Sequence, residues 1–199
     1  MATLRDEVVM LGYGQCMTPA QTRTRTALLV IDVQTDVVAN AHDRNAVIGT
    51  IDGLVTQARS QGQPVVWVQH ADEDLPANTD GWKIVDELSP AADEPLVHKQ
   101  FRDSFEQTNL EQVLVDLDVG SLLVTGAQSD YCVRWTLHGA HARGYNTTLI
   151  SDAHTTDNPR TDSLPSAAQT VAALNSVWGT QVSPGQVASV ATARDVATR

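Results

Sequence analysis

The chain has 199 residues, of which 13 are Lys or Arg and 24 are Asp or Glu, so its net charge near neutral pH is −11. This length is typical of a single domain. The acidic balance excludes a broad nucleic-acid surface or an anionic membrane surface, because both require clustered basic side chains. We therefore expect no nucleic acid and no membrane as partners. We expect a small-molecule substrate, because few residues are available to line a pocket.

The N-terminal segment has no apolar core of the length found in signal peptides, and no stretch reaches the roughly 18 apolar residues of a membrane helix. These features predict a cytoplasmic protein. The two cysteines, Cys16 and Cys132, are far apart and form no CxxC motif, so a disulfide is not expected.

The apolar pattern predicts one α/β domain at 26–199, preceded by an N-terminal arm at 1–25. Continuous apolar runs predict six buried strands, at 26–34, 64–70, 95–99, 121–126, 145–153 and 187–191. Helical spacing predicts helices at 44–61, 109–119, 131–144 and 163–179, with a short helix in the acidic stretch 71–94 and another at the C-terminus. This alternation predicts a doubly wound, six-stranded parallel sheet with helices on both faces.

Ligands of such sheets bind at the carboxyl ends of the strands. The polar residues that follow the predicted strands are Asp32, Gln34, His70, Lys99, Gln128 to Cys132, Asp152 and His154. Three of them, Asp32, Lys99 and Cys132, combine an acid, a cation and a thiol at one sheet edge, which is typical of an activated nucleophile.

Each of the three residues could instead have a purely structural role. Asp32 could cap a loop, Lys99 could be exposed at a strand end, and Cys132 could be a small buried packing residue. Cys132 lies at the start of a predicted helix, whose amides are expected to lower the pKa of a thiol. Lysine is otherwise avoided, since the chain has eleven Arg and only one further lysine, Lys83, which we expect on the surface.

Three sequence blocks carry a resemblance to a known family. ALLVIDVQTD, HKQFRDSF and VTGAQSDYCVRWTLHGAHARGYNTTLISDAHTT resemble the isochorismatase-like cysteine hydrolases, which include nicotinamidases and N-carbamoylsarcosine amidases, over about residues 26–180. The resemblance implies a six-stranded doubly wound sheet and a catalytic triad of Asp32, Lys99 and Cys132. It further implies a cis peptide between Ala127 and Gln128, and an oxyanion hole made by the amides of Gln128 and Cys132.

Some positions depart from the family pattern. Val37 follows Asp36 where many members have Phe, and Gln128 and Ser129 replace residues that are often small or Thr. Members that act on isochorismate lack the cysteine, so Cys132 points away from that chemistry. The metal-binding nicotinamidases have further histidines after the second strand, whereas here His70 is followed by no histidine until His98. We expect no metal and no cofactor.

The resemblance implies a hydrolase that cleaves a C–N bond, of amide, lactam or ureido type, through a thioester. An ester or thioester hydrolase with the same triad, and a non-catalytic scaffold, are the alternatives. We expect Trp135 in the core, and a homo-oligomer, dimer or tetramer, formed through an exposed Trp178 and the arm. The residues expected to bind substrate are Gln34, Trp82, Phe101, Phe105, Tyr131 and His154.

Overall fold

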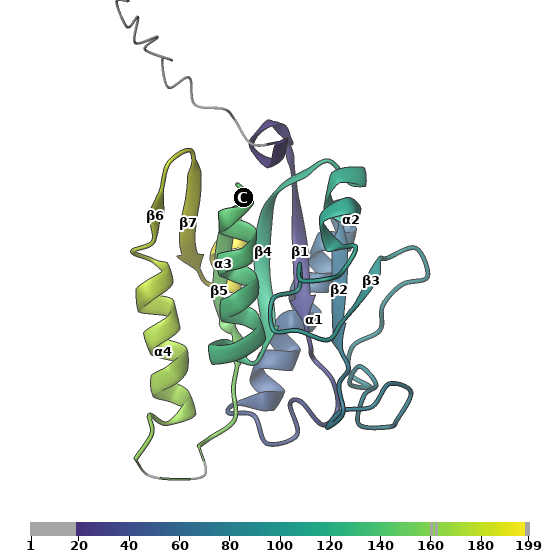
Figure 1. Ribbon diagram of the computed structural model, residues 1–199, viewed down its shortest axis with the longest axis vertical. Helices are drawn as coiled ribbons and strands as arrows, with labels where there is room; N and C mark the ends of the chain where they lie inside the picture. The colour runs from purple at the N-terminus through teal and green to yellow at the C-terminus, as the bar shows by residue number, and fades with distance from the viewer. Residues whose placement is uncertain (1–18, 160, 162, 198–199) are drawn as a thin grey trace, which may run out of the picture.

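The computed structural model describes residues 19–159, 161 and 163–197, and its central feature is one seven-stranded sheet (Figure 1). The strand order is β3-β2-β1-β4-β5-β7-β6, and every neighbouring pair is parallel except β6 and β7. The strands are β1 Arg25–Ile31, β2 Val65–His70, β3 Leu96–Lys99, β4 Val119–Ala127, β5 Asn146–Thr155, β6 Val182–Ser183 and β7 Gln186–Ala191.

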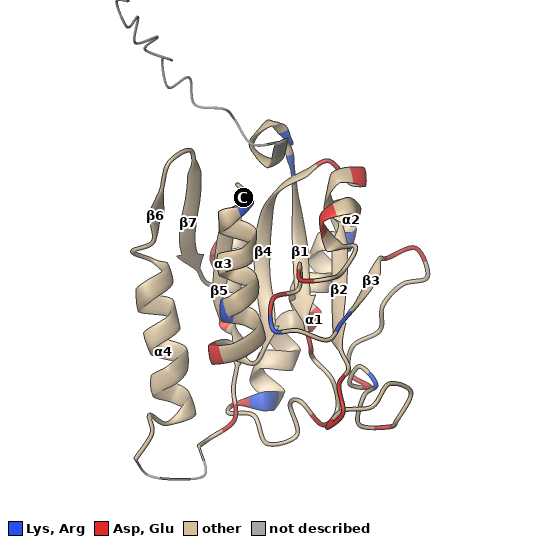
Figure 2. Ribbon diagram, viewed as in Figure 1, with Lys and Arg blue, Asp and Glu red and all other residues tan. Residues whose placement is uncertain are grey.

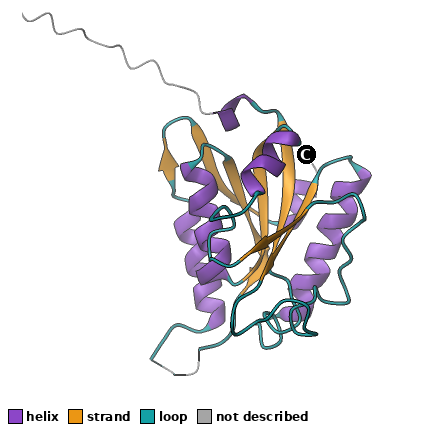
Figure 3. Cartoon of the chain, turned by 45° about the vertical axis from the view of Figure 1, so that its right-hand side comes forward, coloured by secondary structure: helices purple, strands orange, loops and turns teal. Residues whose placement is uncertain are grey.

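Helices cover both faces of the sheet (Figure 3). One face packs against α1 (Arg44–Ser60) and α5 (Ala193–Ala197), through apolar positions of β1 and β2 that alternate with those of the other face. The other face packs against α2 (Leu110–Asp116), α3 (Arg134–Ala142) and α4 (Ala167–Trp178). This arrangement confirms the predicted doubly wound α/β fold.

Two local predictions were wrong. The antiparallel strand β6 was not predicted, because its two residues are too short to leave an alternating pattern; it forms a hairpin with β7 through Gly185, at φ 86°. The stretch 71–94 contains no helix, and its Ile84 instead forms an antiparallel bridge with Gln34 just past β1. Tertiary pairing with the end of β1 overrides the weak local helical pattern.

Trp178 is fully buried rather than exposed, so it is not available for a subunit interface. Its ring packs edge-on against His138 and His141 of α3, at centroid distances of 5.2 and 5.6 Å. The expected oligomer therefore has no support from this residue. No helix within the described part of the chain is long and apolar enough to cross a membrane.

Most of the predicted arm, residues 1–18, lies outside the described residues. The part that is described packs against the domain: η1 (Pro19–Thr22) is a short 3-10 helix that buries Ala20 in the core. Next to it, the Arg23 guanidinium donates to the Tyr145 hydroxyl at 2.6 Å, and that hydroxyl donates to Glu111 at 2.9 Å. These contacts lie at the end of the sheet where β1 and β4 begin.

The connections of the sheet reverse direction between β1 and β4. From β1 the chain proceeds outward to β2 and β3, whereas from β4 it proceeds the other way to β5 and β7. β1 and β4 lie very close together at their carboxyl ends. The gap at Gly126 is so narrow that a side chain there would overlap the backbone of Ile31. A crevice at such a switch point is where open α/β sheets bind ligands.

Candidate active site

The structure brings Asp32, Lys99 and Cys132 together at this switch point. The Nζ of Lys99 lies 2.7 Å from Oδ2 of Asp32 and donates a hydrogen bond to Sγ of Cys132 at 3.1 Å. The side chains of Asp32 and Lys99 are both buried. Asp32 immediately follows β1, Lys99 ends β3, and Cys132 lies in the turn after β4.

The length of a lysine side chain explains how Lys99 reaches this position. Its strand β3 is separated from β1 by β2, and neighbouring strands lie about 4.8 Å apart. The ammonium also contacts Nδ1 of His70, at the end of β2, at 3.2 Å and donates to the Phe101 carbonyl at 3.1 Å. These contacts fix the ammonium between the carboxylate and the thiol.

The electrostatics of the three groups are set by burial. Burial raises the pKa of Asp32, and the attraction of Lys99 only partly opposes this effect. Burial would lower the pKa of Lys99, but the attraction of Asp32 and Cys132 outweighs it, so the pKa is raised and the ammonium stays charged.

The pKa of the Cys132 thiol differs from the value expected for a cysteine near the start of a helix. Burial, reinforced by the Asp32 carboxylate, raises the pKa of Cys132 to about 12, although Lys99 opposes the shift. The prediction of a lowered pKa was wrong, because loss of solvent and a nearby negative charge outweigh the amides of the turn. In the free protein the thiol is therefore neutral.

The backbone around Cys132 has two unusual features. The peptide bond between Ala127 and Gln128 is cis, at the place that the family resemblance implies. The next five residues, η2 (Ser129–Val133), form one π-helical turn, in which the amides of Tyr131 and Val133 donate to the Gln128 carbonyl. Such π-turns occur often at functional sites. α3 follows directly from this turn.

Cys132 opens onto a cleft of about 1160 Å³. Two of the residues predicted to bind substrate, Phe101 and Tyr131, line it and are 44% and 41% exposed. Trp135 also lines the cleft and is 52% exposed, so the expectation that it belongs to the core was wrong. It lies one helical turn after Tyr131, and the helix presents both rings to the same side.

Three other predicted substrate residues do not line this cleft. Gln34 is buried, and its amide donates to the carbonyls of His70 and Trp82 at 2.9 and 2.8 Å while accepting from the His70 amide. Phe105 belongs to the core and packs against Tyr145. His154 is buried between Ser129 and Asn175: its Nδ1 lies 2.8 Å from the Ser129 hydroxyl, and its Nε2 lies 3.0 Å from the Asn175 side-chain oxygen.

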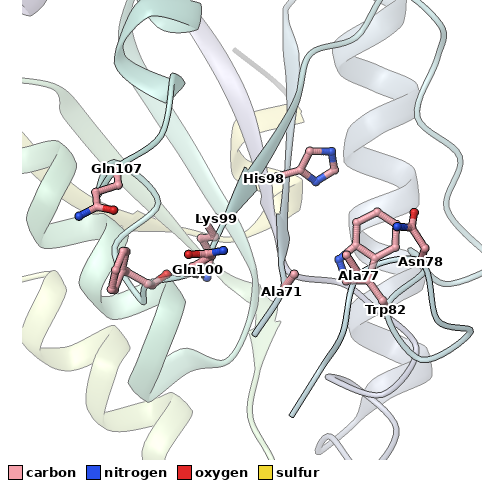
Figure 4. A pocket seen from close by; sticks show the side chains of 9 residues that line it. Ala71, Ala77, Asn78, Trp82, His98, Lys99, Gln100 and Gln107 are labelled. Atoms are coloured by element: carbon pink, nitrogen blue, oxygen red, sulfur yellow. Dashed lines mark hydrogen bonds between the residues drawn. The ribbon is translucent and has the colours of Figure 1, made fainter. Parts of the chain in front are cut away.

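The remaining predicted residue, Trp82, lines a different hollow of about 540 Å³ beside β3 (Figure 4). Its ring stacks on His98 at a centroid distance of 5.6 Å. Figure 4 shows Trp82 and Asn78 on one side of this hollow and Gln107 on the opposite side. Gln100 and Phe101 border both spaces, so Trp82 is a neighbour of the cleft rather than its wall.

Sequence reasoning did not assign the charged residues of the cleft. Arg102 lines it with its guanidinium carbon 4.3 Å from the centroid of the Tyr131 ring. The other charged members are all acidic and come mainly from loops, where no periodic pattern marks them: Asp36, Asp72, Asp74, Asp103, Glu106 and Asp157. In the part of the chain that the structure describes, no three His, Cys, Asp or Glu side chains converge as a set of metal ligands.

Comparisons with known sequences relate the chain to one family. A model of the isochorismatase domain matches residues 26–176. A streptothricin hydrolase from Streptomyces noursei is 35% identical over 176 residues, covering 82% of this chain and 69% of that protein. An N-carbamoylsarcosine amidase from an Arthrobacter species is 38% identical over a shorter stretch of 73 residues, which covers 37% of this chain and 28% of that protein.

Solved structures share the fold. An isochorismatase hydrolase from Oleispira antarctica superimposes with a TM-score of 0.80 at 29% identity, covering 88% of this chain and 97% of that one. A cysteine hydrolase from Pseudomonas syringae pv. phaseolicola has a TM-score of 0.79 at 21% identity, covering 90% and 92%. At that lower identity the likeness establishes the fold alone.

Proposed function

Because the chain belongs to the isochorismatase family of hydrolases, we propose that it cleaves a C–N bond of a small molecule through a thioester on Cys132. One observation carries the proposal. The ammonium of Lys99 contacts both the Asp32 carboxylate and the Cys132 sulfur, below an open cleft of small-molecule size. The amidase and hydrolase names of the relatives support a C–N bond.

In the first half-reaction Asp32 accepts the proton of the neutral Cys132 thiol. Its raised pKa makes Asp32 a stronger base than a surface carboxylate, which suits this transfer. The thiolate then attacks the substrate carbonyl, and the charge of Lys99 stabilises the sulfur anion while it forms.

The carbonyl oxygen becomes an oxyanion as the carbon becomes tetrahedral. We assign its stabilisation to the backbone amides of Gln128 and Cys132, which belong to the cis peptide and to the π-turn that follows it. Each such donor contributes about 3 kcal/mol to stabilising a transition state. Asp32 then returns its proton to the nitrogen, so the C–N bond breaks and an amine or ammonia leaves.

In the second half-reaction a water molecule replaces the leaving group. Asp32 removes a proton from this water, and the hydroxide adds to the thioester carbonyl. Collapse of the second tetrahedral intermediate breaks the C–S bond. The proton on Asp32 returns to sulfur, so the carboxylic acid product leaves and the starting thiol is restored.

The test is a panel of small amides, lactams and ureido compounds assayed for ammonia or amine release, together with mass spectrometry of the quenched protein. We expect turnover and an acyl adduct on the peptide that contains Cys132. Cys132→Ala should fold with an unchanged far-ultraviolet circular dichroism spectrum and lose turnover. Undiminished turnover in that variant would contradict the mechanism, and release of alcohol from esters with no amide turnover would point to the ester-cleaving alternative.

A further inference from the structure

The cleft above Cys132 is strongly acidic, and we propose that its substrate carries a positive charge, as an ammonium or guanidinium group, away from the bond that is cleaved. This inference rests on the proposed function of the cleft. Six of its sixteen lining residues are Asp or Glu, whereas 24 of the 199 residues of the whole chain are acidic. The acidity is therefore concentrated in the cleft and exceeds that of the chain as a whole. Figure 2 shows acidic segments in the loops below β1 and β2, where these strands end.

Few basic side chains neutralise these carboxylates. Asp103 lies 3.5 Å from Nη1 of Arg143, and Asp72 lies 2.8 Å from Nε2 of His70. Within residues 19–159, 161 and 163–197, the remaining four acids form no ion pair with a Lys, Arg or His: Asp36, Asp74, Glu106 and Asp157.

Two other cations at or below the cleft do not cancel these acids. Arg102 is the one arginine in the cleft lining, and its guanidinium lies over the Tyr131 ring. The charge of Lys99 is matched by Asp32 below the cleft floor. A concave surface with an excess of one charge concentrates ions of the opposite charge, so the cleft attracts cations and repels anions.

Two of the carboxylates occupy space beside a glycine of a neighbouring segment. A side chain at Gly81 would overlap the Asp36 carboxylate, and one at Gly139 would overlap the Asp103 carboxylate. Each acid thus occupies space that a glycine leaves open on a neighbouring segment. The two glycines therefore leave room for the carboxylates where they lie.

Asp157 offers the most specific sign of a missing donor. Its Oδ1 is buried and has no hydrogen-bond donor among the described residues, although the side chain lines the cleft. Burial raises the pKa of Asp157, and the nearby Asp130 carboxylate reinforces that shift. A ligand ammonium or guanidinium beside this carboxylate would supply the counter-charge that no Lys, Arg or His of the described residues provides.

The apolar part of the cleft suits the same ligand. Phe101, Tyr131 and Trp135 expose aromatic rings on the same cleft that holds the carboxylates. Aromatic faces attract ammonium and guanidinium groups and also cover the aliphatic chain that bears them. The carboxylates are spread around the cleft and do not converge as metal ligands, which favours an organic cation over a metal ion as their partner.

The test uses three primary amides of equal chain length that end in an ammonium, a methyl or a carboxylate group. We expect kcat/KM for the ammonium-ended amide to exceed that for the methyl-ended one at least tenfold at low ionic strength. The carboxylate-ended amide should be the poorest of the three. Added salt should narrow these differences, because it screens charge over about 10 Å.

Variants locate the effect in the cleft. Asp74→Asn and Glu106→Gln should each reduce the ratio of ammonium to methyl kcat/KM several-fold. Asp118→Asn is the matched control: it removes the same charge beside the start of β4, far from the cleft, and Asn tolerates the left-handed backbone there, at φ 56°. Its ratio should equal that of the parent protein. A ratio near one in the parent, or an equal change in all three variants, would overturn the inference.

Binding separates this inference from the proposed reaction. Titration calorimetry of Cys132→Ala with the three amides measures charge preference without turnover. Preferential binding of the ammonium-ended amide would support the cationic ligand even if Cys132→Ala kept its activity and the thioester mechanism failed. Equal binding of the three amides, with turnover lost in Cys132→Ala, would retain the mechanism and reject the charge preference.

Discussion

The ammonium of Lys99 lies 2.7 Å from the Asp32 carboxylate and 3.1 Å from the Cys132 sulfur, so one cation serves two anions in turn. In the resting protein it balances the carboxylate. When the thiol proton moves to Asp32, the same ammonium balances the thiolate, and no charge is left alone in the buried site.

Replacing Lys99 should therefore affect both turnover and stability. We expect Lys99→Met to lower kcat/KM on the order of a thousandfold. Because Asp32 loses its cation, the free energy of unfolding should fall by about 3 kcal/mol in urea denaturation. The double variant Asp32→Asn/Lys99→Met should regain most of that stability and none of the activity.

Lys83 provides the control for this experiment. It is the other lysine of the chain, exposed and 2.6 Å from Asp80. Lys83→Met should leave both measurements near those of the parent. If Lys99→Met were as active as Lys83→Met, Lys99 would have no part in the reaction.

The pKa of Cys132 gives a second prediction. The Asp32 carboxylate adds to burial in raising this pKa to about 12, so Asp32→Asn should lower it. Thiol alkylation should then proceed at lower pH in Asp32→Asn than in the parent, while turnover falls on the order of a thousandfold because the proton acceptor is lost. The rates are measured against pH with iodoacetamide, in a Cys16→Ser background that leaves one thiol. An alkylation profile shifted to higher pH would be inconsistent with this electrostatic picture.

Gln34 should behave as a structural anchor rather than as a substrate ligand. Gln34→Met keeps the length of the side chain but removes the partner of the His70 carbonyl and amide, whereas the Trp82 carbonyl keeps a second donor, the Gln69 amide. We expect the free energy of unfolding to fall by about 3 kcal/mol, with kcat/KM of the folded protein changed less than about tenfold. Gln61→Met, at an exposed glutamine just past α1, is the control. A large rise in KM at unchanged stability would instead assign Gln34 to substrate binding.

Acid should destabilise the fold through its buried histidines. Burial lowers the pKa of His141 and His154 below the ordinary value of 6.5. The unfolded chain then binds protons that the folded chain refuses, so stability present above about pH 6.5 is lost as the pH falls from there toward the folded pKa values. His141 is the clearest case, because both of its ring nitrogens are buried without a hydrogen-bond partner in the described structure.

Substituting His141 tests this effect directly. His141→Leu should show a smaller loss of urea stability between neutral pH and about pH 5 than the parent does. Activity should be retained, because His141 does not line the cleft. A loss of stability on acidification equal to that of the parent would show that His141 does not contribute to it.

Much of the framework could be predicted from the sequence. Long apolar runs mark β1, β2, β4 and β5, and the rule that parallel strands end at one edge is enough to bring Asp32, Lys99 and Cys132 together. That rule does not depend on knowing any side-chain direction, because it concerns only where each strand stops.

The walls of the site were harder to predict, because they depend on which way each side chain points. Phe101 and Phe105 follow Lys99 within one short loop, yet one borders the cleft and the other fills the core. Trp135 was expected in the core and Trp178 at the surface, but Trp135 is exposed and Trp178 is buried. The sheet beneath α3 and α4 determines which side of each helix is buried. The cleft acids come from separate loops that only the fold brings together.

The contact between Asp103 and Gly139 bears on how substrate preference can change in this protein. The loop after β3 carries Asp103, and it fits against α3 only because position 139 has no side chain. A side chain at position 139 would overlap the Asp103 carboxylate, so the two positions constrain each other. A new loop grafted at 100–107 would therefore have to be introduced together with a compatible residue at position 139, and sequences that diverge in specificity should alter the two positions as a pair.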